Sequence, residues 1–148
     1  MTPPGSRSRR LPRRLLGRAV TLPLLVLLEL ALRTLPVPRV IRACGLRPVP
    51  VAPESPTATT PTLRVRGRAR LVRTGARTLG GRPRCLAQAL TLVLLTRRAA
   101  RDLTLHLGVG RDDAGALRAH AWVRHGGVVV IGGEEAPDFV EVERFALG

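Results

Sequence analysis

Two runs decide how this chain folds: Cys85-Leu86-Ala87-Gln88, which opens an apolar segment, and Ala119-His120-Ala121-Trp122-Val123, which lies in an alternating one. Apolar residues occupy most positions after Cys85, which is typical of a central helix that is buried on most of its faces. We expect this helix to reach Arg101, with Arg97 and Arg98 also near its negative end. Cys85 then lies at the positive end.

The hydrophobic pattern changes from a helical to a strand period after Arg101. Large apolar residues alternate with polar or small ones over 103–109, and a second alternating run covers 117–124. Turn-forming residues at 110–115 separate the two runs, and a glycine pair at 126–127 turns the chain back into 128–131. The order predicts an α+β fold, in which a buried helix packs on a small antiparallel sheet.

A cysteine at a helix start and a histidine on a strand have the layout of a papain-type or transglutaminase-type nucleophile pair. The positive end of the helix favours the thiolate, which is the reactive form. Among the histidines, His120 is the candidate because Trp122 would exclude water from its ring. We expect His106 at a surface or sheet edge and His125 in a solvated turn. A buried structural cysteine with a structural histidine is the alternative interpretation.

The two runs, together with Leu107-Gly108-Val109-Gly110-Arg111 and Val130-Ile131-Gly132-Gly133, resemble the leader peptidase of lasso-peptide biosynthesis, a transglutaminase-like cysteine peptidase family. The resemblance covers residues 63–148 well and the N-terminal region more loosely. It implies that Cys85 is the nucleophile, that His120 is its partner, and that a precursor peptide is cleaved between leader and core. The implied partners are a small leader-binding protein and an ATP-using, asparagine-synthetase-like cyclase.

One position departs from the family pattern. The family often has an aspartate a short way past the histidine, where it orients the imidazole, but here that place falls on or beside Ile131-Gly132-Gly133. Glu134, Glu135 and Asp138 are the nearest carboxylates, and we take Glu134 as the candidate third catalytic residue. The alternative is that Glu134 and Glu135 are solvated loop charges. A Cys–His pair works with a weaker orienting group, since the third residue mainly sets the tautomer and direction of the ring.

The remaining chain divides by composition into a basic and helical N-terminal region (1–46), a proline-rich linker (47–62) and a cysteine peptidase domain (63–148). We expect residues 1–12 to be disordered. Within the domain, residues 63–79 form a basic amphipathic helix, whose apolar stripe covers the core. The apolar stripe consists of Val65, Ala69, Val72, Ala76 and Leu79. The run 139–145 alternates like an edge strand.

The apolar segment 19–32 is interrupted by Glu29 and is shorter than the roughly 20 residues that span a bilayer. We expect a helix that starts near Thr21 and packs on the domain or touches a membrane surface. The basic start also resembles an export signal, but Glu29 and the lack of a small-residue cleavage site favour a cytoplasmic protein, with membrane association through 19–32 left open. Cys44 is expected to be a small packing residue, since a disulfide with Cys85 would quench the nucleophile.

Charge and composition leave other functions open. The net charge is +15 and all 25 basic residues are arginine, yet the chain has few aromatic residues to stack on bases. A basic surface attracts acidic partners such as an acidic leader segment or anionic lipid. No metal-ligand spacing or phosphate-binding glycine loop is visible, so we expect no cofactor. The alternatives are a transglutaminase-like acyltransferase and a non-catalytic protein that binds nucleic acid or a membrane surface.

Overall fold

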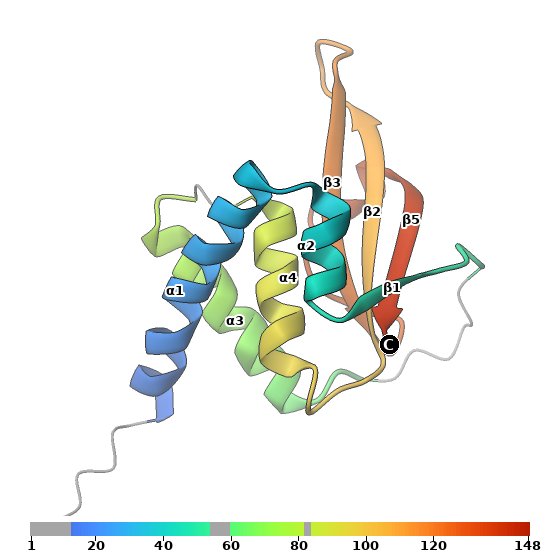
Figure 1. Cartoon of the computed structure of the whole chain (residues 1–148). Coiled ribbons are helices and arrows are strands. Elements are labelled where there is room, and N and C mark those ends of the chain that lie inside the picture. The colour runs from blue at the N-terminus through green and yellow to red at the C-terminus, as the bar shows by residue number, and fades with distance from the viewer. Residues whose placement is uncertain (1–12, 54–59, 82–83) are drawn as a thin grey trace, which may run out of the picture.

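The structure, a computed structural model, describes residues 13–53, 60–81 and 84–148. Helices pack on one side of a five-stranded sheet, which confirms the predicted α+β fold (Figure 1). The expectation of disorder at 1–12 lies outside the described residues. The elements in chain order are α1 (Arg13–Thr34), α2 (Val37–Ala43), β1 (Leu46–Val49), α3 (Leu63–Thr78), α4 (Cys85–Thr96), β2 (Leu103–Arg111), β3 (Leu117–His125), β4 (Val128–Ile131), the 3₁₀ turn η1 (Ala136–Asp138) and β5 (Val140–Leu147).

The sheet has the order β1-β5-β2-β3-β4, and its neighbouring strands are antiparallel. The predicted hairpin of β3 and β4 is present, and it turns at Gly126 and Gly127, which both have positive φ. The prediction that the last strand lies at an edge is wrong, because β5 pairs with β2 on one side and with β1 on the other. Residues 47–49, expected to belong to the linker, form most of β1.

Helix α4 begins at Cys85 as predicted but ends earlier, at Thr96, with Arg97 as its C-cap. Arg98 and Arg101 therefore lie beyond the helix, which corrects the expected end at Arg101. The chain turns here because the amides of Ala99 and Ala100 both donate to the carbonyl of Thr96. Ala100 is buried, so the turn brings the chain back onto the core before β2 begins.

Helix α1 packs against α3 and α4 and contributes Leu25, Leu28 and Leu32 to the same core as the other helices and the sheet. It starts at Arg13 rather than near Thr21. The core residues thus come from both the N-terminal region 1–46 and the predicted domain 63–148. The stripe on α3 is buried at Val65, Ala69, Val72 and Ala76.

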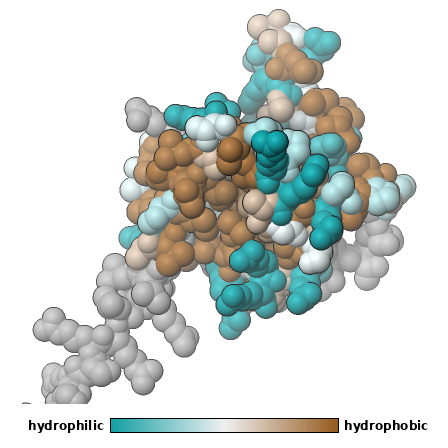
Figure 2. All heavy atoms as spheres, viewed as in Figure 1, coloured by the Kyte–Doolittle hydropathy of each residue, from teal (hydrophilic) through white to brown (hydrophobic). Residues whose placement is uncertain are grey.

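The outward side of α1 is also apolar. Val26, Leu27 and Leu30 are exposed there, and Figure 2 shows apolar side chains gathered over the helical side of the molecule. None of the helices within the described residues is both long enough and apolar enough to pass through a bilayer. Contact of 19–32 with a membrane surface stays a prediction.

Candidate active site

Cys85 is the first residue of α4, and a carboxylate from α1 fixes the residue before it. The backbone N–H of Arg84 donates to Oε2 of Glu29 over 2.9 Å. Glu29 is only 7% exposed, and it also forms ion pairs with the side chains of Arg33 and Arg84. In the sequence Glu29 is an interruption of an apolar run. A lone acidic residue in such a run is costly to bury without partners, and this is the signal that would have pointed to its role.

His120 lies in β3 and is 7% exposed. Its ring lies between Trp122, at a centroid distance of 6.0 Å, and Phe139, at 4.9 Å. Phe139 belongs to the segment that leaves β4 and crosses β3 and β2 before it enters β5. Two glycines of β2 make room for this crossing, because a Cβ at Gly108 would lie 2.9 Å from the carbonyl of Val140 and one at Gly110 would lie 2.6 Å from that of Asp138.

The direction of the His120 ring is set by a backbone atom. Its Nε2 lies 2.8 Å from the carbonyl oxygen of Gly132. A carbonyl can only accept, so Nε2 carries the hydrogen and Nδ1 is the nitrogen that is left to accept a proton. Gly132 has φ +76°, and a Cβ there would lie 2.6 Å from the carbonyl oxygen of Ala121. A glycine is therefore required at the position that orients the histidine.

The candidate third residue, Glu134, does not hold this position in the structure. It is exposed and lines the same cavity, but the ring nitrogen that a carboxylate would hold is already bonded to Gly132. Glu135 forms an ion pair with Arg118 at 3.2 Å, and Asp138 is exposed. The group that contacts Nε2 of His120 is a main-chain carbonyl, which no acidic residue in the sequence marks. The available signal was the glycine pair Gly132-Gly133, which follows the predicted strand.

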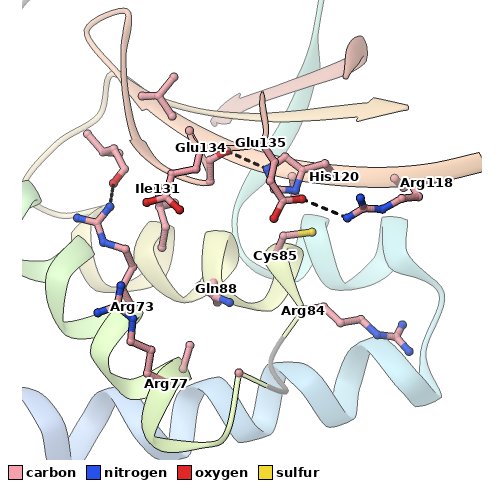
Figure 3. A pocket seen from close by; sticks show the side chains of 18 residues that line it. Arg73, Arg77, Arg84, Cys85, Gln88, Arg118, His120, Ile131, Glu134 and Glu135 are labelled. Atoms are coloured by element: carbon pink, nitrogen blue, oxygen red, sulfur yellow. Dashed lines mark hydrogen bonds and ion pairs between the residues drawn. The ribbon is translucent and has the colours of Figure 1, made fainter. Parts of the chain in front are cut away.

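Cys85 and His120 line one cavity of about 850 Å³ between α3, the start of α4, the edge of β3 and the chain after β4. Figure 3 shows the thiol of Cys85 and the ring of His120 pointing toward one another, with Gln88 one helical turn further along α4. The rim is rich in arginine. Its charged residues are Arg73, Arg77, Arg84, Arg118, Glu134 and Glu135.

A family model described as the transglutaminase-like superfamily matches residues 24–144. The chain belongs to the transglutaminase-like superfamily. A comparison with curated proteins and another with solved structures give no match. Membership of this superfamily indicates a cysteine peptidase or an acyltransferase, in agreement with a cysteine and a histidine that face a common cavity.

The other two histidines of this transglutaminase-like domain are buried, which corrects the expectation of surface positions. His106 is 1% exposed because β2 is an inner strand, and its ring stacks on Trp122 and bonds to Thr104 and Glu141, each at 2.8 Å. The guanidinium of Arg144, and after it the His106 ring, holds the pKa of Glu141 below its ordinary value.

His125 is 4% exposed because β3 extends to this residue instead of ending before it. Its Nε2 lies 3.2 Å from a carboxylate oxygen of Asp102. Cys44 is buried and forms no disulfide with Cys85. Burial raises the pKa of the Cys44 thiol. Cys85, which is only partly buried and lies in the cavity, is therefore the thiol available for chemistry.

Proposed function

We propose that this transglutaminase-like chain is a cysteine endopeptidase that removes the leader from a ribosomally made precursor peptide during lasso-peptide maturation. The observation that carries the proposal is that Cys85 and an oriented His120 meet in one open cavity. The resemblance of the runs around these two residues to the lasso leader peptidases supports the choice of substrate.

The steps use the groups that line the cavity. Nδ1 of His120 takes the thiol proton, and the thiolate of Cys85 attacks the carbonyl carbon of the leader–core amide. The backbone N–H of Cys85, at the start of α4, donates to the oxyanion. The imidazolium then gives its proton to the leaving amine, and a thioester remains. Water attacks the thioester while His120 takes its proton, which releases the carboxylate and restores the thiol.

The surroundings of the pair suit a peptide. A volume of about 850 Å³ is in the range of ligand sites and admits several residues of an extended chain. The arginines on the rim favour a precursor segment with acidic side chains. Arg73, for example, donates a hydrogen bond to the carbonyl of Val130, and because this carbonyl is neutral, the bond leaves the positive charge of Arg73 to attract an acidic side chain. We expect a small leader-binding protein to deliver the precursor and an ATP-using, asparagine-synthetase-like cyclase to consume the released core.

The test is to incubate the protein with the precursor encoded beside it and with the leader-binding partner, and to identify products by mass spectrometry. Cys85→Ala is the test variant and Cys44→Ala is the matched control, since it removes the other thiol. Leader and core should appear with the wild type and with Cys44→Ala, and neither should appear with Cys85→Ala. Cleavage that survives in Cys85→Ala, or no cleavage by folded wild type, contradicts the proposal.

The same assay distinguishes hydrolysis from acyl transfer, because both pass through the same thioester. A primary amine is added to the reaction, and the mass of the leader fragment is read. A free carboxylate as the main product supports the peptidase. An amide of the added amine as the main product, with little carboxylate, would assign the acyltransferase alternative.

A further inference from the structure

Strand β3 has an unpaired edge beside the nucleophile. β3 covers Leu117–His125 and pairs with β2 along its whole length. β4 is short, and it pairs only with the end of β3, at 123–125. The chain leaves the sheet at Gly132. Within the described residues, 117–121 therefore have a neighbouring strand on the β2 side alone.

The hydrogen-bond pattern shows which residues point their backbone groups to this edge. The amide of Asp112 donates to the carbonyl of Ala116 at the closed end of the β2–β3 hairpin, which marks a hydrogen-bonded pair. Such pairs alternate along an antiparallel ladder, so Arg118 and His120 bond toward β2. Leu117 and Ala119 then direct their N–H and C=O groups to the free edge.

An independent contact supports this assignment. By the same alternation, the carbonyl of Ala121 points to the free edge. A Cβ built on Gly132, which follows β4, would meet that carbonyl at 2.6 Å. The oxygen thus lies on the β4 side of β3, where the pattern puts it.

Ala119 is the edge residue that matters for chemistry. It is exposed, it lines the cavity with Cys85 and His120, and its side chain is a methyl group that blocks little space. Leu117 shares the edge orientation and is exposed, but it is outside the cavity lining. An extended chain that pairs with Ala119 would pass through the cavity that Cys85 also lines.

We propose that the substrate segment next to the scissile bond binds as an added strand on the edge of β3, with its main chain paired to the N–H and C=O of Ala119. This proposal rests on the peptidase function. Main-chain pairing gives affinity that tolerates sequence, while alternate side chains of the added strand face the rim and the solvent. It also holds the scissile carbonyl at a fixed height over Cys85, which side-chain contacts alone would not do.

The main experiment measures binding to Cys85→Ala, so that turnover is not needed. The probes are short overlapping peptides from the precursor, labelled with fluorescein, and the best binder is then N-methylated at one backbone position at a time. Fluorescence polarisation gives each dissociation constant. Methylation should weaken binding by about tenfold or more at alternate positions and change it little at those between, because every second N–H faces β3.

Protein variants give a second test in the same background. Ala119→Pro removes one edge N–H inside the cavity, and Leu117→Pro removes one on the same edge outside it. A proline is tolerated where the N–H does not serve the ladder, and equal circular dichroism and melting temperatures check the folding of both. Ala119→Pro should weaken binding by about tenfold, and Leu117→Pro should change it by less than about threefold.

The outcomes separate the two proposals. Cleavage by the wild type with equal binding of every methylated peptide overturns strand addition and leaves the peptidase in place. Alternating binding without cleavage by the wild type supports the edge site and overturns the peptidase. Failure of every peptide and of the full precursor to bind folded Cys85→Ala overturns the edge site.

Discussion

At the scale of single residues, the geometry of the candidate site depends on a glycine as well as on Cys85 and His120. The carbonyl of Gly132 selects the His120 tautomer, and its position follows from a backbone that only glycine adopts without strain. The places of Cys85 at a helix start and of His120 on a strand were predictable from the sequence because both are local patterns. The group that orients the ring was not predictable, because every residue has a main-chain carbonyl. Which carbonyl reaches His120 depends on the path of the chain after β4.

We predict that Gly132→Ala lowers kcat/KM for precursor cleavage by about 100-fold or more, because the added Cβ displaces the carbonyl that orients His120. Gly115→Ala is the matched control: it has a similar φ of +78° but nothing within 4 Å of the added atom. Both variants should lose about 1 kcal/mol of unfolding free energy from the backbone, and only Gly132→Ala should lose the activity. Equal kinetics of the two variants would show that the carbonyl does not orient the ring.

Glu134→Gln tests the residue that the sequence favoured. Because Gly132 already holds Nε2, we expect kcat/KM within about threefold of the wild type, which is the size of a change in a nearby solvated charge. Steady-state kinetics with the same precursor measure it. A loss of more than tenfold would contradict this expectation and support Glu134 as the third catalytic residue.

At the scale of elements, Glu29 joins α1 to the start of α4. Glu29→Ala leaves the Arg84 N–H without its acceptor, so we predict a loss of about 1–3 kcal/mol in unfolding free energy by urea titration and a lower cleavage rate. Glu29→Gln keeps an acceptor oxygen and should lose less. Arg33→Ala is the control, since it removes only an ion pair whose arginine is half exposed, worth roughly 0–1 kcal/mol.

On β2 and β5, the cluster of His106, Glu141 and Arg144 supports Trp122 and makes the unfolding free energy depend on pH. The pKa of Glu141 is lowered in the folded state, so its contribution is present above its ordinary pKa of 4.5 and is lost as the pH falls through the lowered value. Glu141→Gln should therefore be less stable near pH 7 by roughly 1–3 kcal/mol, with a smaller difference from the wild type at about pH 3.

Urea unfolding at the two pH values measures the effect, with the exposed Glu143→Gln from the same strand as control. A stability difference for Glu141→Gln that does not change between neutral and acid pH would contradict this account.

The helices and strands themselves were largely predictable from the sequence, because alternation and helical periodicity are local patterns. The position of β5 inside the sheet was not predictable, because its second neighbour, β1, is formed by residues 46–49, which are far from β5 in the sequence.

At the scale of the whole molecule, one core joins α1 and α2 to the sheet. The predicted domain boundary follows the proline-rich segment. Contacts between residues far apart in the sequence leave no local pattern, so the places of Leu25, Leu28 and Leu32 in the core were not predicted. We predict that a chain of residues 63–148 does not unfold cooperatively, whereas residues 13–148 do. Each buried leucine is worth about 2–5 kcal/mol, so losing three exceeds the stability of many domains. Thermal melts followed by circular dichroism compare the two chains, and a cooperative melt of 63–148 would support the predicted boundary and contradict this expectation.

The hydrogen bond from His120 to the Gly132 carbonyl has a consequence for how such enzymes are catalogued. When the acceptor for the histidine ring is a main-chain carbonyl, the sequence shows only a cysteine, a histidine and a glycine at the site. A survey that accepts peptidases by an intact Cys–His–Asp set would class this chain as a degenerate copy. A survey that asks instead whether the imidazole has an acceptor on Nε2 would include this chain.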